Sequence, residues 1–249
     1  MPLLELRRPP LEGALNVQTL VGAIGQPVLL RRDPKHNPHI LDSIGHEYDF
    51  LGFSELGGKF RRRSAQEQID FCRYSFSQGL RVLPPYDVDH KGRGLYPYLN
   101  QAKTLDEFLP FAKEKEINLI TTQLFSDLWR AHQRGIVYGD RWSKNMLVVP
   151  RRGLVHIDFD IEISGKPARE LEVAQAAYYS LCGGKEKSIP VLAHMLAKGK
   201  GWFDLTVVER FLMQHALHFQ QNPQYGGMVR ETDMLITEAH RQQQRGFSR

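Results

Sequence analysis

Residues 135–160 have the sequence GIVYGDRWSKNMLVVPRRGLVHIDFD, and this stretch decides the fold. Within it, four apolar residues, 146–149, and four strand-like residues, 154–157, flank the turn-forming residues 150–153 (PRRG). Short strand-like runs separated by a few residues that include glycine are typical of a β-hairpin. The stretch therefore predicts two antiparallel strands joined by a tight turn.

A symmetric hairpin of this length pairs Val149 with Leu154 and sets Asn145 opposite Asp158. Side chains on opposed residues of antiparallel strands have Cβ atoms about 5 Å apart. The sequence therefore predicts that an amide and a carboxylate meet at the open end of the hairpin.

These two side chains are suited to a magnesium site. Mg²⁺ prefers oxygen ligands and takes only a few from the protein, completing its octahedron with phosphate and water. Asp140 follows Gly139 and precedes Asn145 by five residues, on a loop that can carry its carboxylate to the same place. There Asp140 could orient or deprotonate a hydroxyl nucleophile. We therefore expect Asn145 and Asp158 to bind metal beside a catalytic Asp140.

The order of these elements resembles the catalytic core of the protein-kinase-like superfamily. A glycine-aspartate on a loop, an asparagine five residues later, a short hairpin and an Ile-Asp-Phe segment carry the resemblance, which covers about residues 95–162. The helix expected over 116–134 matches the one that leads into this loop. The resemblance implies an ATP- and Mg²⁺-dependent enzyme in which Asp140 is catalytic and Asn145 and Asp158 are metal ligands.

The catalytic loop departs from the familiar eukaryotic kinases. Trp142 stands where those kinases keep a lysine that pairs with the γ-phosphate, so Lys144 or Arg141 is the candidate to replace it. We take Lys144 as the second catalytic residue.

The segment after the hairpin also departs from that pattern. Asp160 replaces the usual glycine, and only nine residues separate Asp158 from the helix expected at Ala168, too few for an activation segment. The chain is thus more similar to compact atypical kinases: the RIO-type group, the small tRNA-modification-associated kinase, aminoglycoside and choline phosphotransferases, and lipopolysaccharide core kinases.

The resemblance calls for a phosphate-clamping lysine and a glutamate partner near the N-terminus. Lys59 and Glu67 are the candidates. Two simpler readings stay open: Glu67 also completes a capping box with Ser64, and Lys59 also opens the basic run 61–63, which would lie in solvent.

Tyr98 and Leu99 are the candidates for binding adenine. They end the stretch Gly94–Leu99 (GLYPYL), which resembles the hinge between kinase lobes, where backbone groups hold the base. A strand rich in leucine and tyrosine is also ordinary core, and that alternative stays open.

The fold expected is α+β and bilobal. Residues 1–98 would form a small β-rich nucleotide-binding lobe with one helix, which starts after Ser64 and stops at Gly79. Residues 99–249 would form a mostly helical catalytic lobe. The strands expected in the first part are 28–30, 48–53 and 80–83, and the further helices expected in the second are 168–181, 189–197 and 205–219.

Composition limits the class of protein. The 249 residues carry 33 Lys and Arg against 28 Asp and Glu, for a net charge of +5, which favours an anionic partner such as a nucleotide or nucleic acid. Two cysteines are too few for a disulfide framework or a multi-cysteine zinc site. No apolar run approaches the ~18 residues of a membrane span. We expect a cytoplasmic protein.

The function expected is transfer of the γ-phosphoryl group of ATP to an acceptor hydroxyl. An atypical serine/threonine protein kinase is favoured because the chain is small and basic. One alternative is a kinase acting on a small molecule or a lipopolysaccharide sugar. The other is a kinase-like scaffold that binds nucleotide or RNA through its basic surface and catalyses little.

Overall fold

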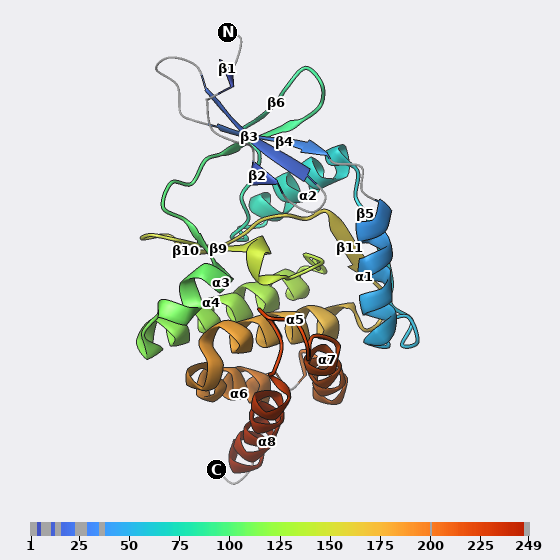
Figure 1. The fold of residues 1–249 in the computed structure, drawn as a ribbon, viewed down its shortest axis with the longest axis vertical. Helices are drawn as coiled ribbons and strands as arrows, with labels where there is room; N and C mark the ends of the chain where they lie inside the picture. Colours follow the sequence, from blue (N-terminus) through green and yellow to red (C-terminus); the bar gives the residue numbers. More distant parts are fainter. Residues whose placement is uncertain are drawn as a thin grey trace.

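The protein has a mixed α+β architecture, as predicted. Figure 1 shows a sheet of short strands near the N-terminus and a group of helices near the C-terminus, with shorter strands between them. The computed structural model describes residues 4–5, 11–12, 16–22, 29–34, 38–199 and 201–246. The division into lobes 1–98 and 99–249 stays a prediction.

Six strands form the larger sheet: β1 (Leu4–Glu5), β2 (Leu11–Glu12), β3 (Asn16–Gly22), β4 (Leu29–Pro34), β6 (Asp87–Val88) and β7 (Gly94–Pro97). Its order is β1-β3-β4-β7-β6, with β2 also paired to β3, and every pair is antiparallel. Gln18 lies opposite Arg32, and Leu30 lies opposite Tyr96. Because side chains alternate along a strand, Leu30 and Arg32 face the same side of this sheet.

Between β4 and β6 the chain forms two helices, whereas one was predicted for residues 1–98. The predicted helix is α2 (Ala65–Ser77), and the capping box of Ser64 and Glu67 is present. An additional helix, α1 (Pro38–Phe50), occupies part of the region predicted as a strand over 48–53, so that strand prediction is wrong.

The spacing of apolar residues in α1 explains the error. Ile40, Ile44 and Tyr48 recur every four residues and pack on the main core, which is helical spacing. The window 48–53 was too short to show this period. α1 stands along one side of the molecule and reaches the level of the C-terminal helices (Figure 1).

A separate two-stranded sheet joins β5 (Lys59–Arg62) to β11 (Ile161–Ser164), with Lys59 opposite Ser164. This pairing holds the segment after the Asp-Phe-Asp sequence against the residues that lead into α2.

The predicted hairpin forms, but its register differs by one residue. β9 (Met146–Val149) pairs with β10 (Gly153–His156), and Val149 lies opposite Gly153 rather than Leu154. The turn holds three residues because Arg151 adopts a left-handed φ of 63°. Ile157 donates its backbone N–H to the Asn145 carbonyl (3.0 Å) and takes the place predicted for Asp158.

A third, shorter strand, β8 (Lys103–Thr104), pairs with β9 on the side away from β10. The strand predicted over 80–83 is reduced to a single bridge between Val82 and His156. Leu83 adds one hydrogen bond to the His156 carbonyl (3.1 Å).

The predicted C-terminal helices are confirmed to within a few residues. They are α4 (Glu114–Gln133), α5 (Ala168–Gly184), α6 (Ile189–Lys198) and α7 (Leu205–His218), with α3 (Leu105–Phe108) and α8 (Val229–Gly246) in addition. Most of α5 is buried, so it forms the centre of this helical group. Within the ranges described, we find no helix that has both the length and the apolar character needed to span a membrane.

A buried histidine makes the stability of this helical group depend on pH. Burial lowers the pKa of His215 in α7 to about 4, whereas an unfolded chain has a histidine pKa of about 6.5. As the pH falls, the unfolded state therefore takes up a proton first, and stability is lost between about pH 6.5 and 4. We expect the free energy of unfolding to fall by about 3 kcal/mol over that interval because of His215.

Chemical denaturation at a series of pH values tests this expectation. The His215→Phe variant, which places another ring among Tyr178, Tyr179 and Phe219, should have a shallower decline than the wild type below pH 6.5. Parallel declines in the two proteins would contradict it.

Candidate functional site

Two cavities meet beside the hairpin. The sheet cavity has a volume of about 360 Å³ and is lined by the large sheet, including Leu30 and Tyr96. The helix cavity has a volume of about 480 Å³ and is lined by α1, the loop 139–145 and the C-terminal helical region. Asp158 and Lys144 line both cavities. The predicted site residues can therefore act on ligands in two adjoining spaces.

A buried arginine joins the two segments that carry the candidate aspartates. Arg63 is 6% exposed and donates hydrogen bonds from Nη1 to the carbonyls of Tyr138 (3.3 Å), Phe159 (3.1 Å) and Ile161 (3.2 Å). Its guanidinium also lies 4.2 Å from the ring centre of Phe71 in α2. The expectation that the run 61–63 lies in solvent is therefore wrong for Arg63, which fixes the backbone of the site.

Gly139 permits this close approach of the loop and β11. It has a φ of 107°, and a Cβ added there would lie 1.9 Å from the Ile161 carbonyl oxygen. The backbone N–H of Gly139 donates to Glu172 Oε1 of α5 (3.0 Å). Only glycine fits at this position without displacing the backbone.

Gly139→Ala should therefore destabilise the protein strongly. Backbone strain alone costs roughly 1–3 kcal/mol, and the steric clash adds to it. Urea denaturation measures the change. Gly135→Ala is the matched control, because Gly135 has a φ of 69° and no atom within 4 Å of an added Cβ, so its loss should be smaller. Equal losses in the two variants would show that the contact with Ile161 is unimportant.

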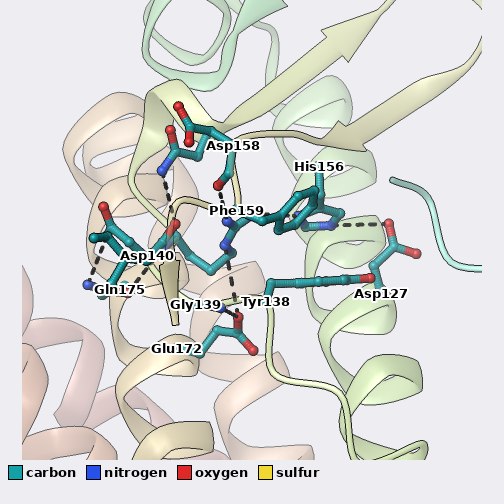
Figure 2. A network of polar contacts seen from close by, with 12 residues as sticks. Asp127, Tyr138, Gly139, Asp140, His156, Asp158, Phe159, Glu172 and Gln175 are labelled. Atoms are coloured by element: carbon teal, nitrogen blue, oxygen red, sulfur yellow. Dashed lines mark hydrogen bonds and ion pairs between the residues drawn. The ribbon is translucent and has the colours of Figure 1, made fainter. Parts of the chain in front are cut away.

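Asp140 lies in the helix cavity with its carboxylate held from α5. Gln175 Nε2 donates to Asp140 Oδ1 (3.2 Å), as Figure 2 shows. Asn145 Nδ2 donates to the Asp140 carbonyl (3.0 Å). Burial raises the pKa of Asp140 to about 6, although Arg141 and hydrogen bonds from Trp142 and Gln175 act in the opposite direction. A carboxylate with a pKa near neutral is suited to accept a proton.

Beneath Asp140, a buried network holds the loop in place (Figure 2). Arg141 is fully buried, donates from Nη2 to the Asp158 carbonyl (3.0 Å) and lies 3.9 Å from Glu172. His132 Nδ1 accepts from Trp202 (2.9 Å), so His132 Nε2 carries the proton that is donated to Glu172 (2.6 Å). This network ties the loop to α4 and α5.

Asn145 and Asp158 both line the helix cavity despite the shifted register. A shift of one residue normally turns side chains to the other face of a strand. Asp158 lies beyond the end of β10 and has a left-handed φ of 57°, a strained conformation for a residue other than glycine. Because of this local turn, the side-chain direction of Asp158 does not follow the alternation of side chains along β10.

The two side chains fit a magnesium ion by their donor chemistry. Because Asn145 Nδ2 is used by the Asp140 carbonyl, the amide oxygen of Asn145 is available to a cation. Burial tends to raise the pKa of Asp158, but an ion pair with Arg32 and hydrogen bonds with Asp160 hold it below its usual value. Asp158 is thus ionised at neutral pH, as a metal ligand must be.

Arg32 of β4 is the residue that sequence reasoning missed. Its Nη2 atom lies 2.5 Å from Asp158 Oδ1 and 3.2 Å from Asp160 Oδ2, and its Nη1 atom lies 3.4 Å from Gln68 Oε1 of α2. The signal available in the sequence was the alternation of side chains along β4, which puts Arg32 on the same face of the sheet as Leu30. Sequence reasoning looked instead for a lysine, as the family resemblance suggested.

The predicted ion pair between Lys59 and Glu67 is not formed, so that prediction is corrected. Because β5 pairs with β11 and not with the large sheet, Lys59 is exposed at the start of β5. Glu67 pairs with Arg61 (2.8 Å) and closes the capping box with Ser64. Neither Lys59 nor Glu67 is among the residues that line the two cavities.

The remaining candidates lie at the cavities. Tyr98 and Leu99 directly follow β7 and line the sheet cavity. Lys144 is exposed, and its Nζ atom lies 4.9 Å from the ring centre of Trp142, at the junction of the two cavities. The structure thus places Asp140, Lys144, Asn145 and Asp158 at the helix cavity, of which Lys144 and Asp158 also line the sheet cavity, with Tyr98 and Leu99 at the sheet cavity.

Comparison with known proteins identifies the fold. No protein-family model matches the chain, and no curated protein sequence matches it. Among solved structures, the chain is similar to the Rio2 kinase–ADP/Mg²⁺–phosphoaspartate complex from Chaetomium thermophilum, with a TM-score of 0.50 and 11% identity. The match covers 98% of this chain and 72% of that chain. The protein therefore has a protein-kinase-like fold, as the sequence motifs predicted.

Proposed function

We propose that this protein is a phosphotransferase that moves the γ-phosphoryl group of ATP to an acceptor hydroxyl. The observation that carries the proposal is the meeting of the two cavities at Asp158 and Lys144, with Asp140 in the helix cavity. A nucleotide in the sheet cavity would direct its terminal phosphate to this junction. The kinase-like fold supports the proposal, as does the presence of ADP and Mg²⁺ in the similar Rio2 structure.

The nucleotide would be bound by residues of the sheet cavity. Backbone groups of Tyr98 and Leu99 would hold the adenine, and Leu30 and Tyr96 would cover its faces. Arg32, and not Lys59, would contact the phosphates, because Arg32 lies in the sheet cavity beside Asp158. Guanidinium groups are well suited to phosphate oxygens because they present several donors in a fixed geometry.

Asn145 and Asp158 would hold Mg²⁺, which when bound offsets the negative charge of the phosphates. Arg32 would then exchange its contact with Asp158 for one with a phosphate oxygen. Asp160 is its second carboxylate partner and would keep the guanidinium in place.

The acceptor hydroxyl would be oriented by Asp140. Gln175 holds the Asp140 carboxylate from α5, and a pKa of about 6 lets Asp140 take the hydroxyl proton at neutral pH. The acceptor oxygen forms a bond to the γ-phosphorus as the bond from that phosphorus to ADP breaks, and Asp140 later releases the proton to water. The ammonium group of Lys144 would neutralise charge on the transferred group.

The helix cavity favours a small acceptor over the protein acceptor expected from composition. α1 forms one wall of this cavity through Ile40, Ile44 and Glu47, and Phe219 and Tyr225 form another. A serine or threonine of a folded protein would have to enter this space on an extended segment. A small molecule with a hydroxyl group needs no such segment.

The scaffold alternative drew in part on the basic run at 59–63. Arg61 pairs with Glu67 and Glu162, and Arg63 is buried. These contacts engage Arg61 and remove Arg63 from the surface, so we favour the enzyme.

Incubation with γ-labelled ATP and Mg²⁺ tests the proposed function. The purified protein is assayed alone and with a cell extract separated into protein and small-molecule fractions. We expect label to move to a compound of the small-molecule fraction. Binding of Mg·ATP without turnover in any fraction would instead favour the scaffold.

A further inference from the structure

A third cavity lies outside the proposed active site. Its volume is about 630 Å³, and none of the residues that line it also lines the sheet cavity or the helix cavity. Its walls include parts of α2 and β11, the loop 135–137 and the first residues of α5, and we call it the α5 cavity. The phosphoryl transfer proposed above places no reacting group in this space.

The first turn of α5 brings unused hydrogen-bond donors to this cavity. The helix has 17 residues, follows Pro167 and has no side-chain cap at its N-terminus. Within the described residues, the backbone N–H groups of Arg169 and Glu170 donate to no acceptor. Free N–H groups at the start of a helix carry a partial positive charge and attract anions.

Two exposed cations stand beside this helix end. Lys166 and Arg169 line the α5 cavity, and neither forms an ion pair with any residue that the structure describes. Two carboxylates also line it. Glu162 already pairs with Arg61 (2.6 Å), and Glu170 Oε1 accepts a hydrogen bond from the backbone N–H of Asp204 (3.2 Å). The two cations therefore remain available to an anionic ligand.

Arg63 provides an independent sign of such a ligand. It lines the α5 cavity although it is only 6% exposed. Its Nη1 atom donates to three carbonyls and its Nε atom lies 3.5 Å from Glu162, whereas its Nη2 atom has no partner in the described part of the chain. Buried polar groups are usually hydrogen-bonded, so an unused donor of a buried guanidinium at a cavity wall indicates an acceptor in that cavity.

The electrostatic environment of Arg63 also favours an anion. Burial lowers the pKa of this guanidinium, and the neighbouring Arg141 and Arg61 act in the same direction, although Glu162 opposes them. A negative charge placed beside Arg63 would stabilise its charged form.

We infer that the α5 cavity binds a phosphate group, either as free phosphate or on a small organic molecule. Arg63 Nη2, the side chains of Lys166 and Arg169 and the free N–H groups of α5 would donate to its oxygens. A phosphate can accept from donors in several directions at once, as this arrangement of three segments requires. Tyr74 and Trp202 also line the cavity and would contact an attached organic group. The inference does not depend on the proposed function, because the cavity lies outside the active site.

A phosphate bound here would act on the active site through Arg63. The same guanidinium holds the carbonyls of Tyr138 and Phe159, which lie next to the segments that carry Asp140 and Asp158. A ligand that fixes Arg63 should therefore make both segments more rigid.

Calorimetric titration with inorganic phosphate and with phenyl phosphate, without nucleotide or Mg²⁺, tests the inference. We expect both to bind the wild-type protein, and Lys166→Gln and Arg169→Gln each to weaken binding about tenfold, as the loss of one charge-assisted hydrogen bond should. Lys115→Gln makes the same change of charge at an exposed position outside the cavity and should have no effect. Tighter binding of phenyl phosphate would identify an organic phosphate as the ligand, and equal binding would identify free phosphate.

A change of opposite sign and a measurement of location complete the test. Glu170→Gln removes a like charge from the cavity, and its amide oxygen can still accept from Asp204, so it should tighten phosphate binding by about threefold. Phosphate should also slow hydrogen exchange in residues 163–171 and in the loop 138–141.

The contrary outcomes are distinct. Phosphate that does not bind the wild-type protein at millimolar concentration, or that binds Lys166→Gln and Arg169→Gln as tightly as the wild type, would overturn the inference. Binding that is lost in Lys144→Gln instead would also overturn it, because the phosphate would then lie at the junction of the other two cavities. Binding of Mg·ATP reports separately on the proposed function and is unaffected by these results.

Discussion

Asp140→Asn is expected to lower the rate of phosphoryl transfer by a factor of about 10² to 10⁴, the usual contribution of a positioned base. The amide cannot take the proton of the acceptor hydroxyl. Its carbonyl oxygen can still accept the hydrogen bond from Gln175, so the loop should keep its geometry. Loss of γ-phosphate from labelled ATP, with and without acceptor, measures the effect.

The stability of this variant distinguishes a chemical role from a structural one. Asp140 is a partly buried carboxylate near Asp158, so replacing it with a neutral group should leave the melting temperature unchanged or raise it. Affinity for Mg·ATP should remain close to that of the wild type. Transfer at the wild-type rate in Asp140→Asn would show that Asp140 is not the base. The surface control is Asp42→Asn, which makes the same change at an exposed position.

Arg32→Met should have the second large effect, on both stability and nucleotide binding. The variant removes the guanidinium that pairs with Asp158 and Asp160, and removing one member of a largely buried ion pair costs roughly 3 kcal/mol. It also removes the proposed phosphate contact, so stabilisation by Mg·ATP should be much smaller than in the wild type. Denaturation curves with and without Mg·ATP measure both quantities.

Two further variants complete the test of Arg32. Arg32→Lys keeps the charge but not the forked geometry, so it should recover part of the stability and part of the nucleotide response. Lys59→Met removes an exposed side chain outside both cavities and should change stability by less than about 0.5 kcal/mol. If Lys59→Met abolished nucleotide binding and Arg32→Met did not, the original sequence prediction would be restored.

The parts of the site that sequence could predict are close together along the chain. The spacing of Asp140, Asn145 and Asp158 reflects local structure, a loop, one turn of 3₁₀ helix and a hairpin, and all three residues lie at the helix cavity. The helical spacing of apolar residues in the C-terminal helices is also a local pattern, and each helix is long enough for this spacing to be recognised.

The parts that sequence could not predict depend on long-range pairing. Arg32 and Asp158 are 126 positions apart in the sequence. They meet because the fold brings β4 of the large sheet next to the segment that follows the hairpin. Lys59 was named as the phosphate-clamping lysine because nothing in the sequence near it indicates that β5 pairs with β11 and lies away from the large sheet. The one-residue error in the hairpin came from Arg151, whose left-handed conformation is unusual for an arginine.

Glu47 shows a further limit of local patterns. The residue directly precedes the strand predicted over 48–53, and its place in the helix cavity became visible only when α1 was found to pack beside α7. The acceptor side of the site is built from such distant segments, so the motifs of the catalytic loop carry no information about it.

Calorimetric titration with a non-hydrolysable ATP analogue tests the central claim most directly. The account predicts that Mg²⁺ strengthens binding to the wild-type protein and that Asp158→Asn removes this dependence on Mg²⁺, while Glu162→Gln, which changes a carboxylate outside both cavities, retains it. Equal binding with and without Mg²⁺ in the wild type, or a Mg²⁺ dependence that survives in Asp158→Asn, would contradict the claim that this junction is the nucleotide–metal site of a phosphotransferase.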